Sequence, residues 1–185
     1  TIGPDPTTGE IEWDYPGAGV PSTASFTSSP AVGAPYLFVG SSTDSSMYCI
    51  YLMPPVVSPP THIGILRWTY KTSGNIYSSP AAVAGRCIFG STDHYIYCLD
   101  TFINPAISLS PNYIWRTRTN SQVYSSPVVS NQTVYIGSND YNLYALTMIT
   151  GGIQWKFTSG GLIKSSPLVY DGVIYIGSYD KYLYA

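Results

Sequence analysis

The sequence predicts an all-β fold in which one supersecondary unit occurs four times. Each copy reads as a tryptophan, Ser-Ser-Pro, an apolar run ending in Gly-Ser, an aspartate, and then Leu/Met/Ile-Tyr. From the proline to the glycine is ten residues in every copy, and successive prolines are 50, 47 and 40 residues apart. A fixed period in this range is typical of repeat architectures. The residues that set the register are Pro30, Pro80, Pro127, Pro167, Gly40, Gly90, Gly137 and Gly177.

The third copy shows why each unit reads as four short strands. Residues 127–130 begin the first strand, 133–137 alternate as the second, 142–146 form the third and 153–157 the fourth. β-Branched and aromatic residues fill these segments, and turn residues separate them. In the last copy the first turn is Asp171-Gly172, a strong two-residue hairpin signal. No segment combines a helical period with capping residues, so we expect no helix longer than two turns.

Four antiparallel strands repeated at this period describe the blades of a β-propeller. Three strands lie between Ser-Ser-Pro and Leu-Tyr, so we expect each tryptophan on the outermost strand of its blade. The chain also opens with a tryptophan strand at 11–15, and its last copy lacks that strand. We therefore predict one propeller domain or segment over 1–185, with repeat anchors near 13–52, 65–100, 113–146 and 151–185.

Composition narrows the function classes. Charged residues make up only 10% of the chain, well under the usual quarter, whereas tyrosine occurs 18 times. A low fraction of charged residues suits stacked sheets whose faces are largely covered. Tyrosine suits them as well, because it adds apolar area together with a hydroxyl that can find a partner at the edge of a core. The net charge of −2 argues against nucleic acid as a partner. No run of 18 apolar residues occurs, so no membrane span is predicted.

The repeated polar residues offer two readings. The aspartates after Gly-Ser could form a ring that collects a cation, or each could accept its own backbone N–H groups in an Asx turn, which we favour. The serines lack a recurring histidine to activate them, so we read Ser-Ser-Pro as a strand start. Serines and aspartates should lie at one end of the blades, around the axis, and any ligand should bind there. The residues of this candidate binding face are Asp44, Asp93, Asp140, Asp180, Tyr77, Tyr124, His94 and Lys164.

The three cysteines are Cys49, Cys87 and Cys98, an odd number without metal-ligand spacing. Cys49 and Cys98 take the repeat position of Ala145, which indicates small core residues. Cys87 and Cys98 fall on neighbouring strands, so a disulfide in an oxidising compartment stays open as an alternative. Residues 131–133 (Asn-Gln-Thr) form an N-glycosylation sequon on a predicted hairpin turn.

The run Gly-Ser-Asn-Asp-Tyr-Asn-Leu-Tyr-Ala-Leu at 137–146, followed by Gly151 and Trp155, resembles the PQQ-like repeat. This repeat builds the blades of quinoprotein alcohol dehydrogenases and of the outer-membrane assembly lipoprotein BamB. The family pattern Ala-x-Asp-x-x-x-Gly-x-x-x-Trp is kept in part, with Thr147 where aspartate is usual. The resemblance implies that blades dock on one another through Trp13, Trp68, Trp115, Trp155, Gly9, Gly64 and Gly151.

Enzymes of this family bind pyrroloquinoline quinone and calcium on the propeller axis, commonly with adjacent cysteines and Glu/Asn/Asp metal ligands. Here no two cysteines are adjacent, and glutamate occurs only as Glu10 and Glu12. We therefore expect no cofactor, no metal and no catalysis. The resemblance favours an extracytoplasmic (periplasmic or secreted) scaffold that displays loops for protein or glycan contacts. The alternative is a fragment of a PQQ-dependent quinoprotein dehydrogenase whose cofactor site lies outside this segment.

Propellers of this family usually carry seven or eight blades, so the resemblance implies that four blades are part of a larger ring. An open stack would expose a sheet edge and an apolar blade face. The missing blades could come from the same longer chain, which we favour, or from a second copy that exchanges its first strand.

Overall fold

The computed structural model describes residues 21, 23–52, 64–102, 111 and 113–185, which contain strands and turns but no helix. The first sheet consists of β1 (Ala31–Gly33), β2 (Tyr36–Gly40), β3 (Ser46–Leu52) and β4 (Gly64–Lys71). The second consists of β5 (Ala81–Val83), β6 (Arg86–Gly90), β7 (Tyr95–Asp100) and β8 (Tyr113–Arg118). The third consists of β9 (Val128–Ser130), β10 (Thr133–Gly137), β11 (Asn142–Thr147) and β12 (Ile153–Thr158). The fourth consists of β13 (Leu168–Tyr170), β14 (Val173–Gly177) and β15 (Leu183–Tyr184).

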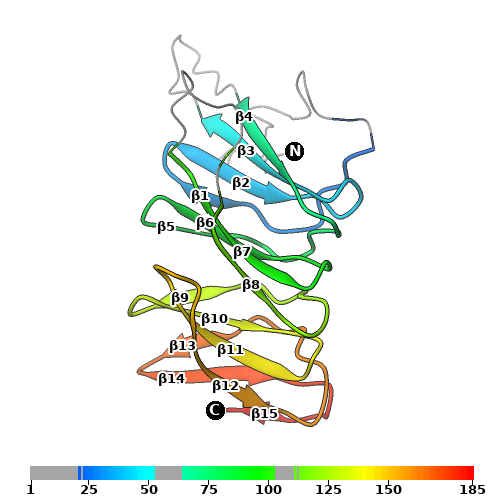
Figure 1. The fold of residues 1–185 in the computed structure, drawn as a ribbon, viewed down its shortest axis with the longest axis vertical. Helices are drawn as coiled ribbons and strands as arrows, with labels where there is room; N and C mark the ends of the chain where they lie inside the picture. Colours follow the sequence, from blue (N-terminus) through cyan, green and yellow to red (C-terminus); the bar gives the residue numbers. More distant parts are fainter. Residues whose placement is uncertain (1–20, 22, 53–63, 103–110, 112) are drawn as a thin grey trace, which may run out of the picture.

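Each sheet is an antiparallel meander whose strands pair in chain order. The four sheets stack along the longest axis of the molecule, with β1–β4 at one end and β13–β15 at the other (Figure 1). The first strands β1, β5, β9 and β13 contact one another from sheet to sheet. The four-bladed all-β prediction is confirmed, and so is the three-stranded last sheet.

The tryptophan strands form the opposite edge of the sheets. Trp68, Trp115 and Trp155 lie on β4, β8 and β12, each the last strand of its sheet. Their predicted outermost position is confirmed, whereas Trp13 and the expected strand 11–15 lie outside the described residues. Since every sheet begins at Ser-Ser-Pro, an anchor such as 113–146 covers the last strand of one sheet and three strands of the next.

In the last three sheets the first hairpin turns on two residues with positive φ. Asn131 and Gln132 have φ of 48° and 59°, and Asp171 and Gly172 have 48° and 76°. Two positive values are typical of the type I′ turn, whose twist matches that of the strands it joins. The Asp171-Gly172 hairpin is therefore confirmed. The sequon asparagine Asn131 is solvent-exposed on its turn.

A β-bulge explains why the residue opposite each tryptophan is small. In the first three sheets the third and fourth strands slip register next to this pair. The pairs are Cys49–Trp68, Cys98–Trp115 and Ala145–Trp155, and all three small residues are fully buried. A bulge re-aims the bulged strand, so the indole turns toward the neighbouring blade. Cys49 and Cys98 are thus small core residues, as predicted.

The core lies between neighbouring sheets, where the Gly-Ser glycines allow close approach. A Cβ on Gly40 would come within 2.4 Å of the Ile76 side chain, and one on Gly137 within 2.2 Å of Ile163. Ile76 and Ile163 precede the Ser-Ser-Pro of the next blade, so each leading segment packs on the glycine of the preceding blade. Each of these glycines therefore leaves the space that the isoleucine of the next leading segment fills.

A disulfide between Cys87 and Cys98 is excluded, because all three cysteines are free and buried. Cys87 pairs across the strands with Leu99, and Ile88 pairs with Cys98. Neighbouring residues of a strand point to opposite faces. Cys87 accordingly packs in the core between the first two sheets, and Cys98 in the core between the second and third.

Candidate binding face

The first serine of each Ser-Ser-Pro motif serves the fold of its own blade. The hydroxyl oxygen of Ser28 accepts the Gly40 N–H at 2.8 Å. The same bond recurs at 3.0 Å from Gly90 to Ser78, from Gly137 to Ser125 and from Gly177 to Ser165. These hydroxyls tie the start of the first strand to the end of the second strand.

The second serine links one blade to the next. The N–H of Ser29 donates to the hydroxyl oxygen of Ser79 at 2.8 Å. Ser79 donates in turn to Ser126 at 2.8 Å, and Ser126 to Ser166 at 3.0 Å. These contacts form a serine ladder that runs from blade to blade beside the first strands. The serines therefore have a structural role at the end of the blades where the first strands begin.

The repeated aspartates are saturated by hydrogen bonds within the chain. Asp140 accepts the N–H of Asn142 at 3.1 Å, which is an Asx turn, and the N–H of Asn120 at 2.9 Å. The hydroxyl of Tyr144, four residues on, also donates to its carboxylate. Every blade repeats the Asx bond and the tyrosine contact, in the pairs Asp44–Tyr48, Asp93–Tyr97, Asp140–Tyr144 and Asp180–Tyr184. In the second, third and fourth blades the carboxylate also accepts an N–H of the leading segment, from Ser73, Asn120 and Gly160 respectively. These carboxylates therefore clamp the blade to its leading segment rather than facing a ligand.

The same contacts act on the ionisation of Asp140. Burial by itself raises the pKa of this carboxyl, but the hydrogen bonds from Tyr144, Asn120 and Asn142 together bring the pKa below its usual value. A carboxyl whose pKa is lower in the folded state stabilises the fold above its unfolded pKa. That stabilisation is lost as the pH falls through the folded pKa.

Replacing Asp140 with asparagine is expected to lower the free energy of unfolding at pH 7 by about 1–2 kcal/mol, because the half-exposed carboxylate accepts charge-assisted hydrogen bonds. The variant should also lose less stability than the wild type between pH 5 and pH 2, which urea denaturation across this range would measure. Asp171→Asn, on an exposed turn where asparagine adopts the same φ, is the matched control and should change neither quantity. An unchanged pH dependence in Asp140→Asn would contradict the clamp.

Three of the predicted face residues come together in a row at this end. Tyr77, Tyr124 and Lys164 occupy the same repeat position, directly before Ser-Ser-Pro. The rings of Tyr77 and Tyr124 stack with centroids 5.1 Å apart at 28°. The Lys164 Nζ lies 5.0 Å from the Tyr124 centroid and 5.3 Å from that of Tyr179, within cation–π range. We call these four residues the tyrosine–lysine row.

The row is accessible to solvent, since Tyr77 is 39% exposed and Tyr179 64% exposed. Tyr179 was missed by the sequence reasoning because the corresponding residues, Thr92 and Asn139, are not aromatic. His94 is placed differently. Its backbone has φ of 73°, and its carbonyl accepts two bonds from Thr119, so it acts through its main chain where the paired strands β7 and β8 meet within one blade.

The tryptophan contacts show how one blade docks on the next. The Trp115 Nε1–H donates to the Met148 carbonyl at 2.9 Å, and Thr117 donates to the Gly151 carbonyl at 2.7 Å. A Cβ on Gly151 would lie 2.5 Å from the Trp115 ring, and its φ of 70° also favours glycine. Gly151 thus seats the tryptophan of the preceding blade.

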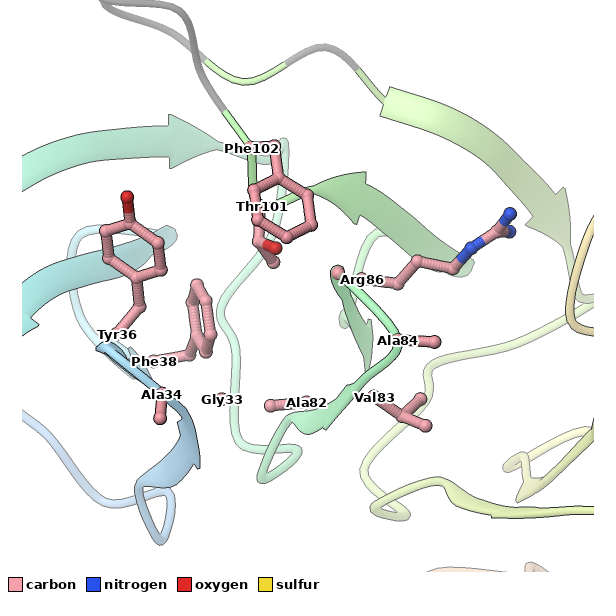
Figure 2. A pocket seen from close by; sticks show the side chains of 11 residues that line it. Gly33, Ala34, Tyr36, Phe38, Ala82, Val83, Ala84, Arg86, Thr101 and Phe102 are labelled. Atoms are coloured by element: carbon pink, nitrogen blue, oxygen red, sulfur yellow. The ribbon is translucent and has the colours of Figure 1, made fainter.

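A small pocket of about 190 Å³ lies between the first two sheets, at the hairpins β1–β2 and β5–β6 (Figure 2). Tyr36, Phe38 and Ala82 line it, and Arg86 is the charged residue among the side chains drawn. The Arg86 guanidinium extends away from the pocket and donates to the Met148 carbonyl at 2.6 Å. The described residues that line the pocket include no histidine, cysteine, aspartate or glutamate that could act as a nucleophile or general base.

The described residues do not fit a quinone–calcium site. The aspartates already accept several donors each, and no group of three or more His, Cys, Asp or Glu in the described ranges could hold a metal ion. Burial raises the pKa of the Cys98 thiol to about 12, although Arg86 opposes the rise. Burial also raises the pKa of Cys87 and of Cys49. Such thiols are poor nucleophiles at neutral pH.

Comparison with known proteins agrees with this blade geometry. A family model described as "Outer membrane protein assembly factor BamB" matches residues 109–185. The fold of the described residues resembles that of PQQ-like β-propellers. BamB from Moraxella catarrhalis has a similar structure, with a TM-score of 0.72 at 20% identity. The similarity covers 95% of this chain and 49% of that BamB chain, so this chain spans about half its length.

Two further structures have a similar fold. The computationally designed Ika4 protein has a TM-score of 0.70 at 11% identity, over 89% of this chain and 91% of its own. The quinohemoprotein alcohol dehydrogenase from Comamonas testosteroni has a TM-score of 0.63 at 17% identity, over 85% of this chain and 29% of its own. No curated protein matches the sequence. At these identities the likeness concerns the fold.

Proposed function

We propose that this PQQ-like propeller is a non-catalytic binding module that contacts a protein or glycan partner through the tyrosine–lysine row. The observation that carries the proposal is a contrast at one end of the blades. The polar groups that recur in every repeat, its serines and aspartates, are used in hydrogen bonds within the chain. In the tyrosine–lysine row, Tyr77 and Tyr179 are exposed at the two ends, and the half-buried Tyr124 and Lys164 lie between them.

The chemistry of the row suits a binding surface. Tyrosine supplies rigid apolar area and a hydroxyl at a low cost in conformational entropy, which is why it is enriched in interfaces. Stacking of Tyr77 on Tyr124 fixes both rings before a partner arrives. Such rings can pack against apolar side chains of a protein or the C–H face of a sugar, and Lys164 adds a hydrogen-bond donor.

The same proposal places the protein outside the cytoplasm, in a periplasmic or secreted location. Its support is the match to the family described as an outer membrane protein assembly factor. Within the described ranges, no helix is long and apolar enough to cross a membrane. Nucleic acid is not the expected partner, given the net charge of −2.

The double substitution Tyr77→Ala and Tyr124→Ala is expected to weaken partner binding at least tenfold, because it removes the stacked platform. Peptide and glycan arrays would identify binders of the wild-type protein, and calorimetry would then compare the variants. Tyr170→Ala, at an exposed tyrosine on β13, is the control and should bind as the wild type does. Binding that survives the double substitution, or is lost equally in the control, would contradict the proposed face.

The alternative function is a fragment of a PQQ-dependent quinoprotein dehydrogenase, which the fold shared with the Comamonas testosteroni enzyme favours. Because the described residues do not fit quinone and calcium, that site would lie outside this segment. The purified chain with added pyrroloquinoline quinone and calcium should therefore give no dye-linked alcohol oxidation. Turnover that requires the quinone would overturn the non-catalytic assignment.

A further inference from the structure

The turn between β9 and β10 carries a motif that neither the blade fold nor the binding face uses. Asn131, Gln132 and Thr133 form the sequence Asn-x-Thr with a middle residue that is not proline. None of the six other asparagines of the chain has a serine or threonine two residues on. The motif is not a requirement of the repeat, because the equivalent turns of the other blades read Ala-Pro, Ala-Gly and Asp-Gly.

The turn presents the Asn131 side chain to solvent. Asn131 and Gln132 are both exposed at the tip of the hairpin, with positive φ at both residues. Asp171 occupies the position of Asn131 in the fourth blade with the same φ of 48°, so a short polar side chain suits this backbone conformation. A bulky group attached to the Asn131 amide would therefore extend into solvent and not into the core.

The amide of Asn131 is not used in the fold. In the part of the chain that the structure describes, its Nδ2 makes no hydrogen bond, and a side chain contacts only its backbone oxygen, through the Thr133 hydroxyl at 3.5 Å. Asn142 differs, because its Nδ2 donates to the Asp140 backbone oxygen at 2.9 Å. Attachment of a group to the Asn131 amide would therefore break no contact among the described residues.

A surface hollow of about 440 Å³ lies beside this asparagine, between the β9–β10 turn and the β11–β12 turn. Its lining includes Asn131, Gln132, Ile149, Thr150 and Gln154. The Ile149 side chain is 56% exposed there. Amide and hydroxyl groups can exchange hydrogen bonds with sugar hydroxyls, and the C–H face of a sugar ring can pack on an aliphatic side chain. The hollow thus offers a place for the first sugar of an attached glycan.

The turn lies away from the proposed binding face. Tyr124 precedes β9, whereas Asn131 directly follows the last residue of that strand. Because β9 runs between them, the tyrosine–lysine row and the turn are at opposite ends of the third blade. A glycan on Asn131 would therefore leave the row open to its partner.

We propose that Asn131 is an N-glycosylation site. This inference rests on the proposed location outside the cytoplasm, because the motif is used in secreted proteins. The donor is an oligosaccharide joined to a lipid through a diphosphate. The Asn131 Nδ2 forms a bond to C1 of the first sugar, the bond from C1 to the diphosphate oxygen breaks, and the lipid diphosphate leaves while the amide loses one proton. Thr133 supplies the hydroxyl that the motif requires.

Mass spectrometry of the protein purified from its native cells is the first test. Trypsin releases residues 119–156 as one peptide, which contains Asn131 together with Asn120, Asn139 and Asn142. Fragmentation of this peptide should place a glycan on Asn131 and none on the other three asparagines, which are internal controls. An unmodified Asn131 in the native protein would overturn the proposal.

Three variants produced in the same cells separate the motif from the turn. Thr133→Ser keeps the hydroxyl and should remain glycosylated, whereas Thr133→Val has a similar shape without the hydroxyl and should lose the glycan. Asn131→Asp should also lose the glycan and keep the hairpin, because aspartate has the same φ in the fourth blade. Far-ultraviolet circular dichroism should be the same for all three. A Thr133→Val protein modified as the wild type would contradict attachment through this motif.

The location is measured separately, so that the glycosylation and the proposed function can fail independently. Fractionation of the same cells shows whether the protein lies outside the cytoplasm. An extracytoplasmic protein with an unmodified Asn131 would refute the glycosylation alone. A cytoplasmic protein would refute the proposed location and the glycosylation with it. Asn131→Asp should bind a partner of the tyrosine–lysine row as the wild type does, because the turn lies at the other end of the blade.

Discussion

Replacing Trp115 with alanine is expected to lower the free energy of unfolding by about 3–5 kcal/mol, the range for truncating a buried tryptophan. Its indole packs on Gly151 of the next blade and donates to the Met148 carbonyl. The substitution removes this apolar contact and leaves a carbonyl with one donor fewer. Urea denaturation followed by circular dichroism would measure the change.

Ile114→Ala provides the matched control for this loss. Ile114 precedes Trp115 on β8, points to the other face of the strand and is 41% exposed. Its truncation should cost less than about 1 kcal/mol, because little buried area is lost. Equal destabilisation in the two variants would mean that the tryptophan does not dock the blades.

Gly137→Ala should destabilise the fold by about 1–3 kcal/mol, because a single added methyl group overfills the contact between the third and fourth blades. The new Cβ would lie 2.2 Å from the Ile163 side chain, with the Ile163 backbone oxygen 3.0 Å away. Gly152→Ala is the control. Its Cβ would meet only threonine hydroxyls at 3.2 and 3.3 Å, which can move aside.

A double-mutant cycle assigns the cost to this contact. Ile163→Ala removes the side chain that the new methyl group meets. Its combination with Gly137→Ala should therefore lose less stability than the sum of the two single changes. Additive losses would mean that the glycine is required for some other reason.

Much of the fold was predictable because its signals are local. Hairpin turns such as Asp171-Gly172 and the alternation within strands need only a few neighbouring residues. The constant spacing between Pro127 and Gly137 adds the register of the whole blade. The position of each tryptophan on the last strand of its sheet then followed, because three other strands precede it in the chain. The Cys87–Cys98 disulfide, left open as an alternative, is ruled out by the register, because a one-residue step along a strand reverses the face to which a side chain points.

The candidate site was predicted only in part. Tyr77, Tyr124 and Lys164 share one repeat position, so their assembly into a row was foreseeable from the register. The aspartates were included in the binding face, but their donors come from tyrosine hydroxyls and from a backbone N–H 20 residues away. Sequence patterns do not show which acceptors are already occupied. Tyr179 was missed because no other copy has an aromatic residue at its position.

Site-specific photo-cross-linking tests the proposed binding face most directly. A benzophenone side chain replaces Tyr124 in one variant and Tyr170, exposed on β13, in another. Both proteins are produced in their native cells and irradiated. The account predicts adducts from position 124, lost when Tyr77→Ala is added, and none from position 170. Adducts that form at position 170 but not at position 124 would contradict it.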